Sequence, residues 1–350
     1  MTTDSPNFAC PLPILQHDRI QLAHGSGGKL SADLINRLFL PRFGNEILNR
    51  LDDQAILNPA SGRLAFSTDS YVVDPIFFPG GDIGDLAING TVNDIAMSGA
   101  RPLWLSAAFI IEEGLPMADL NRVLVSMEKA ARAAGVTIVT GDTKVVNRGS
   151  CDKLFITTSG IGLIPEGVTM SAASIRSGDC LIISGTFGDH GLAILTCREG
   201  LSFETRIASD TAALNGLVEN MLGVSQDIHA MRDPTRGGVA ATLNEWAKAS
   251  SIGIVIAEEK LMVKPEVRAA CEILGIDPLH AANEGKLLAA VPADKAEEIL
   301  AAMHRHPLGK QAAIIGQATP NHPSLVVLRT VLGVERIIDM PVGELLPRIC

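Results

Sequence analysis

Strand-length apolar runs and helix-length amphipathic segments alternate along the chain. The clearest helix is MADLNRVLVSMEKAARAAG at 117–135, where apolar side chains recur on one face and the final glycine provides a natural stop. A β-branched run, VTIVTGDT at 136–143, follows it directly. A second helix is expected over 81–100 with Asp82 as its cap, and further strands over 63–70, 103–111 and 154–164. This alternation predicts an α/β fold.

The same pattern returns after a polar, turn-rich segment at 164–179. A strand, a glycine turn and a helix are expected over 180–195, a helix over 236–250 and a strand over 252–259. Because 350 residues are many for one hydrophobic core, we expect two domains that meet near residue 170. The predicted units are an N-terminal domain at 1–169, a C-terminal α/β domain at 170–338 and an extended tail at 339–350, whose prolines and glycine exclude a long helix.

Composition excludes several functional classes. The net charge of −10 argues against nucleic acid as a partner, because phosphate contacts need clustered Lys and Arg. No run approaches the roughly 18 apolar residues of a membrane helix, and the N-terminus does not resemble a secretory signal. The six cysteines are scattered without a C-x-x-C pair, which disfavours a zinc site or a disulfide framework. We therefore expect a soluble, reduced, cytoplasmic protein.

Acidic side chains recur where predicted strands end. Asp69 and Asp142 each follow an apolar strand, and Asp52, Asp53 and Asp94 lie in similar polar stretches. Ligands of α/β folds bind at this edge of the sheet, and converging carboxylates suit Mg²⁺, which shares oxygen ligands with phosphates. The alternative for each residue is a turn or a cap. Four such stretches in one domain favour a magnesium site.

A glycine-rich stretch, AHGSGGKL at 23–30, is a candidate anion-binding loop. Gly25, Gly27 and Gly28 can present backbone N–H groups to an anion, with Lys29 alongside. It is not a P-loop, which would need glycine at position 23 and Ser or Thr at position 30. A flexible loop is the alternative, but the nearby candidate magnesium ligands favour a loop that covers phosphates.

Two further stretches carry candidate groups. Arg236 lies in RDPTRGGVA at a predicted helix start, where backbone N–H groups favour anions. Glu284 lies in HAANEGKL before an apolar strand. The alternatives are a helix cap and a turn. His190, in GDHG, has no assigned role.

The last residue is a cysteine, Cys350, in LLPRIC. A terminal residue is usually frayed and unpacked, so we expect its thiol to bury little. From Asp339 the tail spans at most roughly 40 Å, at ~3.3–3.6 Å per residue. That length would let the thiol reach both a partner and a site on its own chain.

Together these stretches resemble the HypE family of hydrogenase maturation proteins. The resemblance rests on HGSGGK, LDDQAIL, STDSYVVDPIFFPGGDIG, VNDIAMSGA, TGDTKVV, DPTRGGV, ANEGKL and the terminal PRIC, in that order from about residue 20 to the end. STDS, NDIA and GDTK are general to the wider aminoimidazole ribonucleotide synthetase-like (PurM-like) superfamily, whereas the terminal PRIC is specific to HypE. The first twenty residues carry no motif that we can place.

The resemblance implies a two-domain PurM-like fold whose N-terminal domains pair in a homodimer, with ATP and Mg²⁺ as ligands. It implies an ATP-dependent carbamoyl dehydratase that converts an S-carbamoyl group on Cys350 to a thiocyanate, the source of cyanide for the iron of [NiFe]-hydrogenase. The implied partners are the carbamoyltransferase HypF, which loads the cysteine, and the HypC–HypD complex, which receives the cyanide.

The resemblance also implies roles for the candidate residues. Asp52, Asp53, Asp69, Asp94 and Asp142 would hold Mg²⁺ and orient phosphates, and Gly25, Gly27, Gly28 and Lys29 would cover the triphosphate. Lys144 would stabilise developing charge, Glu284 would act as general base, and Arg236 would contact phosphate. Two alternatives stay open: a synthetase of the same superfamily acting on a free small substrate, and a scaffold that uses Cys350 to bind a metal or a partner. The glycine-rich loop lacks the cysteine usual in selenophosphate synthetases.

Overall fold

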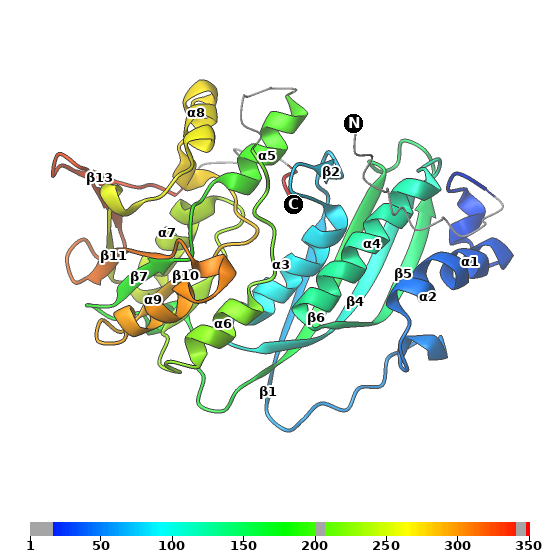
Figure 1. The fold of residues 1–350 in the computed structure, drawn as a ribbon, viewed down its shortest axis with the longest axis horizontal. Helices are drawn as coiled ribbons and strands as arrows, with labels where there is room; N and C mark the ends of the chain where they lie inside the picture. Colours follow the sequence, from blue (N-terminus) through cyan, green and yellow to red (C-terminus); the bar gives the residue numbers. More distant parts are fainter. Residues whose placement is uncertain (1–16, 200–206, 341–347) are drawn as a thin grey trace, which may run out of the picture.

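The computed structural model describes residues 17–199, 207–340 and 348–350, and it contains two large mixed sheets covered by helices (Figure 1). The first sheet has the order β1–β6–β4–β5, formed by β1 (Arg63–Tyr71), β4 (Arg101–Glu112), β5 (Thr137–Val146) and β6 (Leu154–Ile164). One face is covered by α3 (Ile83–Met97) and α4 (Met117–Ala134), while the other exposes Leu64, Phe66 and Ile110. A short helical region with α1 (Lys29–Leu34) and α2 (Leu40–Phe43) lies beside β5.

The second sheet has the order β13–β12–β9–β11–β7–β10–β8. Its strands are β7 (Cys180–Ile183), β8 (Ala230–Arg232), β9 (Gly253–Ala257), β10 (Leu288–Val291), β11 (Ala313–Thr319), β12 (Val326–Arg329) and β13 (Glu335–Ile337). The helices of this half are α5 (Asp189–Arg198), α6 (Asn215–Leu222), α7 (Gly238–Ser250), α8 (Pro265–Leu274) and α9 (Ala296–His304). A two-stranded ribbon, β2 (Phe77–Phe78) and β3 (Gly81–Asp82), precedes α3.

Two of the expected helices have the cap or the stop that the sequence predicts. Asp82 caps α3, because its carboxylate accepts the N–H of Gly84 at 2.8 Å. Gly135 ends α4 with a left-handed φ of 70°, a conformation that glycine adopts without steric cost. The two-domain mixed α/β architecture is thus confirmed.

One expectation about the sheets is wrong. Asp69 and Asp142 do not follow their strands but lie inside β1 and β5. Strand hydrogen bonds come from the backbone, so a polar side chain does not by itself end a strand. The sheets are also mostly antiparallel, with β4–β5 and β9–β12 as the parallel pairs among the described strands. No helix in the described ranges is long and apolar enough to cross a membrane.

The two halves share buried surface around α3. Ala96 and Met97 at its end pack with apolar side chains of α6, while α5 and α8 contribute to the core of the first sheet. The chain end lies in this boundary region, close to β2 and α5 (Figure 1). Residues from both halves therefore meet the C-terminus.

Candidate active site

The last three residues are docked on the N-terminal domain. The N–H of Asp74 donates to the carbonyl of Arg348 at 3.3 Å, and the N–H of Val72 donates to a terminal oxygen of Cys350 at 3.0 Å. Ile349 is only 4% exposed, and Cys350 packs against the same core. The expectation of an unpacked terminus is therefore wrong, because two backbone hydrogen bonds and one buried side chain hold it. Residues 341–347, most of the predicted tail, lie outside the described residues.

Two side chains of α5 fix the docked end through backbone carbonyls. His190 donates from Nε2 to the carbonyl of Ile349 at 2.6 Å. The Arg198 guanidinium donates to the carbonyls of Asp74 at 2.7 Å and Arg348 at 2.9 Å. Burial lowers the pKa of His190, which favours the neutral ring. The C-terminal half thus clamps the terminus onto the N-terminal half.

A group of carboxylates lies at the same boundary, contributed by β1, α3 and two loops of the C-terminal half. Asp94 accepts the Ser67 hydroxyl at 2.7 Å, and burial raises its pKa. Burial and the charge of Asp94 raise the pKa of Asp233 to about 7. Burial, then Asp233 and the other nearby carboxylates including Asp69, raise the pKa of Glu284 well above its usual range. Like charges therefore oppose ionisation here, and a bound cation would relieve them.

Glu284 is held by its backbone on both sides. Its N–H donates to Asp210 at 3.1 Å, and its carbonyl accepts from Asn93 of α3 at 3.2 Å. The next residue, Gly285, has no room for a side chain, since a Cβ would lie 1.8 Å from the carbonyl oxygen of Asp210. The Glu284 side chain, 2% exposed, is thereby kept in the acidic group.

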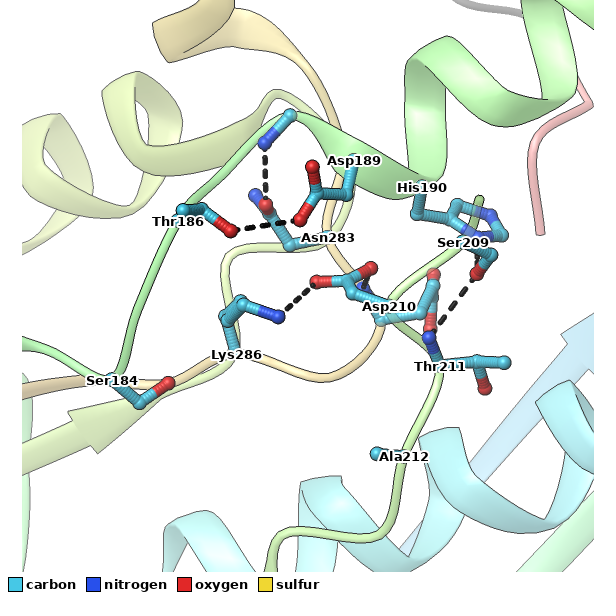
Figure 2. Close-up of polar contacts among 12 residues, drawn as sticks. Ser184, Thr186, Asp189, His190, Ser209, Asp210, Thr211, Ala212, Asn283 and Lys286 are labelled. Atoms are coloured by element: carbon cyan, nitrogen blue, oxygen red, sulfur yellow. Dashed lines mark hydrogen bonds and ion pairs between the residues drawn. The ribbon is translucent and has the colours of Figure 1, made fainter. Parts of the chain in front are cut away.

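The buried carboxylate of Asp210 is paired with the ammonium of Lys286 beside the acidic group (Figure 2). Burial would raise the pKa of Asp210, but the charge of Lys286, 3.1 Å away, and the hydrogen bonds from the Glu284 N–H and from Lys286 lower it below the usual range. Nearby, Asn283 accepts the N–H of Gly188 at 2.7 Å and donates to the carbonyl of Pro234 at 3.0 Å. These bonds fix the start of α5 and the loop with Asp233 relative to Glu284.

A second group of predicted residues lies on the outer edge of the first sheet. Gly25 lies against β5 so closely that a Cβ would be 2.4 Å from the Val145 nitrogen. Gly27 has a left-handed φ of 81°, and Lys29 is exposed at the start of α1. This loop and β5 line a cavity of about 270 Å³ whose wall includes Gly25, Gly27, Asp142, Lys144, Phe39 and Phe109. Polar rims and apolar walls of this kind suit a nucleotide.

The five predicted magnesium ligands do not converge within one chain. β1, with Asp69, and β5, with Asp142, are the two edge strands, three strand spacings or about 14 Å apart at ~4.8 Å per spacing. Asp52 and Asp53 are exposed, and Asp52 lines a 310 Å³ cavity beside β5. The described residues accordingly hold no group of three or more His, Cys, Asp or Glu side chains placed to bind a metal.

Two predicted charged groups are exposed. Lys144 lies 3.9 Å from Asp142, with both side chains about two-thirds exposed. Arg236 is exposed in the turn before α7. Both are therefore accessible to an anionic ligand.

Comparison with known proteins places this geometry in a family. The N-terminal domain of the AIR synthase related proteins matches residues 51–164, and their C-terminal domain matches residues 176–328. A carbamoyl dehydratase HypE from Bradyrhizobium diazoefficiens is 55% identical over 95% of this chain and 96% of its own. The chain belongs to the HypE family. It is accordingly an enzyme, since the HypE relatives are named carbamoyl dehydratases.

Solved HypE structures extend the likeness to three dimensions. A hydrogenase maturation protein HypE in complex with ATP, 52% identical, has a TM-score of 0.91 and covers 94% of this chain and 99% of that one. A HypE–HypF complex contains a chain 51% identical, with a TM-score of 0.78, covering 88% of this chain and 99% of that one. An ATP complex and a HypF complex therefore both exist for proteins with this fold.

Three residues of this HypE-family site had no predicted role there. Asn93 precedes the predicted Asp94, but its buried amide pins the loops of Ala212 and Glu284 onto α3. Asp233, in the stretch RDPTRGGVA at a predicted anion-binding helix start, lies in the acidic group instead. His190 holds the C-terminus. Their motifs, VNDIA, RDP and GDHG, were visible in the sequence, but their partners are distant in the chain.

Proposed function

We propose that this chain catalyses the ATP-dependent dehydration of an S-carbamoyl group on Cys350 to a thiocyanate, which supplies the cyanide ligand for the iron of [NiFe]-hydrogenase. The observation that carries the proposal is the docked chain end, which places the residue before the thiol against His190, next to the Ser209–Asp210 segment that bonds Glu284. A terminal cysteine used only to bind an outside partner would not need a seat at the domain boundary.

The proposed reaction replaces a poor leaving group. The carbamoyl oxygen attacks the γ-phosphorus of ATP, the bond to ADP breaks, and an O-phosphorylated intermediate forms. Loss of both protons from the nitrogen and of the phosphate from carbon then leaves S–C≡N, ADP and inorganic phosphate. The thiol sulfur is a tether that holds the carboxamide at the phosphate, which raises its effective concentration.

Glu284 is the proposed base for these protons. Its pKa is raised by burial and by the neighbouring carboxylates, so its proton affinity lies closer to that of the carbamoyl nitrogen that it must deprotonate. Lys144 is proposed to stabilise charge on the phosphoryl group or on the intermediate. A cation among the carboxylates would favour the ionised, basic form of Glu284.

The proposed ATP ligands are Gly25, Gly27, Gly28, Lys29 and Arg236, with Asp52, Asp69, Asp94 and Asp142 contacting phosphates through Mg²⁺. Asp53 completes the proposed magnesium set. The donor chemistry fits, because these are oxygen ligands and because Asp94 has a pKa raised by burial, a cost that a divalent cation offsets. When bound, Mg²⁺ neutralises charge on the transferred phosphoryl group.

A homodimer is proposed to complete the site. The glycine-rich loop with Asp142 and the group with Asp69 lie at opposite edges of one sheet, so a second copy is needed to bring them together. The sheet face away from the helices offers a surface for pairing, since Phe66 is 70%, Leu64 48% and Ile110 42% exposed there. Isologous pairing through such a face would bury these side chains.

The proposed partners are HypF, which would load the cysteine, and the HypC–HypD complex, which would receive the cyanide. The HypF complex of a 51% identical chain supports the first. We propose a cytoplasmic location for this work, which uses ATP and a reduced thiol.

ATP turnover tests the proposal against a free small substrate. Chain carbamoylated at Cys350 should release phosphate in the presence of Mg²⁺, and Cys350→Ala treated identically should not. Phosphate release that is equal in the two proteins would exclude the cysteine-linked reaction.

A further inference from the structure

His190 is a buried group that the proposed chemistry does not use. It is the second residue of α5, is fully buried, and packs edge-on against Phe78 at 5.6 Å between ring centroids. Its ring nitrogens lie 2.8 Å from the Ser209 hydroxyl and 2.6 Å from the carbonyl of Ile349. Figure 2 shows the imidazole facing Ser209.

The partners of the ring fix its tautomer. The carbonyl of Ile349 can only accept, so Nε2 must carry a proton. In the neutral ring Nδ1 then accepts the Ser209 hydroxyl proton, and the same hydroxyl oxygen accepts the N–H of Thr211 at 3.1 Å. This chain of donors keeps the Nε2–H directed at the C-terminus.

The carbonyl that His190 holds belongs to the peptide bond of Cys350. A planar peptide places the Cα of Cys350 once the carbonyl of Ile349 is oriented. Each partner comes from a different part of the fold: α5, the Ser209 segment whose N–H donates to Pro79 at 2.8 Å, and the docked end beside Val72. The imidazole therefore joins both halves of the chain to the residue that bears the thiol.

We propose that His190 is a positioning residue that seats Cys350 for the reaction by donating from Nε2 to the peptide carbonyl before it. This inference rests on the proposed function for its consequence, but the seating itself can be measured without turnover. His190 acts through the peptide and does not exchange protons with the carbamoyl group.

Accessibility of the thiol tests the seat directly. A protease specific for glutamate releases the peptide 345–350 after Glu344, so labelling of Cys350 can be followed by mass spectrometry apart from the other cysteines. His190→Leu removes the donor, and labelling by a thiol reagent should become roughly five- to tenfold faster, the effect of one lost buried hydrogen bond. His190→Gln keeps an N–H donor near the Nε2 position and should restore most of the protection.

A matched control is His229→Gln. His229 is also a buried histidine of the C-terminal half, bonded to Asp179 at 2.6 Å, but it does not contact the docked end. Labelling of Cys350 should match the wild type in this variant. The proposal would be overturned if Cys350 in His190→Leu is labelled as slowly as in the wild type. It would also be overturned if Cys350 is labelled as fast in His190→Gln as in His190→Leu.

A double-mutant cycle separates seating from general stability. The melting temperature is compared for His190→Leu and wild type, each with and without residues 348–350. If His190 holds the chain end, His190→Leu should lower the melting temperature less when residues 348–350 are absent. An equal decrease with and without these residues would mean that the role of His190 is only structural. If His190→Leu does not fold, Ser209→Ala, which removes the tautomer-fixing partner, carries the same cycle and labelling test.

Turnover gives the last readout. In carbamoylated chain, His190→Leu should slow single-turnover thiocyanate formation about tenfold at unchanged half-saturating ATP, and His190→Gln should recover most of the rate. If Cys350 is labelled faster in His190→Leu but no thiocyanate forms even in the wild type, the positioning role of His190 is supported and the proposed function is contradicted. If His190→Leu forms thiocyanate and is labelled at the wild-type rates, the positioning role of His190 is contradicted and the proposed function is supported.

Discussion

Asp233→Asn should make the protein more stable at pH 8 and leave its stability nearly unchanged at pH 4. The pKa of Asp233 is raised to about 7 from 3.8, chiefly by burial and then by the charge of Asp94. A carboxyl whose pKa is raised in the folded state contributes stability that is fully present at low pH and is lost as pH rises from about 4 through about 7. The asparagine has the same shape and no charge, so it avoids this loss.

The magnitude follows from the shift. About three pKa units, at about 1.4 kcal/mol each, set an upper limit of about 4 kcal/mol on the gain at pH 8. We expect about 1–3 kcal/mol, because a proton taken up by Asp94 or Glu284 relieves part of the repulsion in the wild type. Urea unfolding at pH 4, 6 and 8 without Mg²⁺ measures the difference.

The control is Asp294→Asn, an exposed aspartate before α9, which should change the free energy of unfolding by less than about 0.5 kcal/mol at every pH. Added Mg²⁺ should stabilise the wild type at pH 8 more than it stabilises Asp233→Asn. If the wild type and Asp233→Asn lose stability in parallel between pH 4 and pH 8, Asp233 does not bear the like-charge repulsion described here.

The remaining predictions concern catalysis. Asp94→Asn should abolish Mg²⁺-dependent ATP turnover and leave the fold intact, because a ligand charge is lost at constant size; normal phosphate release would count against a role in metal binding. Glu284→Gln should bind ATP but accumulate carbamoylated, undehydrated Cys350, because an amide cannot accept the proton; a normal rate of dehydration in quench-flow samples would leave Glu284 structural. A tag appended after Cys350 should prevent thiocyanate formation, because the added residues would have to fit beside the docked terminal carboxylate, which accepts the N–H of Val72; full activity of the tagged chain would contradict entry by the free end.

Local signals predicted the elements of this fold well. The cap at Asp82, the stop at Gly135 and the apolar face of α4 depend on neighbours within a few residues, so the sequence alone indicates them. The spatial arrangement of the site residues was harder to predict from the sequence. Asp69 and Asp142 were expected to lie together where their strands end. The strand order places them on β1 and β5, the two outermost strands of the sheet, and this order depends on pairing between residues far apart in the chain.

The C-terminus shows the same limit. LLPRIC alone indicates a frayed end, because it has no local partner to pack against. Its partners are Val72, Asp74 and His190, which lie more than 150 residues earlier in the sequence. Only the tertiary structure brings these groups together.

Cys350 is the proposed site of the dehydration. The most direct test of this role is mass spectrometry of the peptide 345–350 after carbamoylation and incubation with ATP and Mg²⁺. We expect the carbamoylated peptide to lose the mass of one water, with one phosphate released for each peptide converted. A peptide that stays carbamoylated while ATP is consumed would contradict this role.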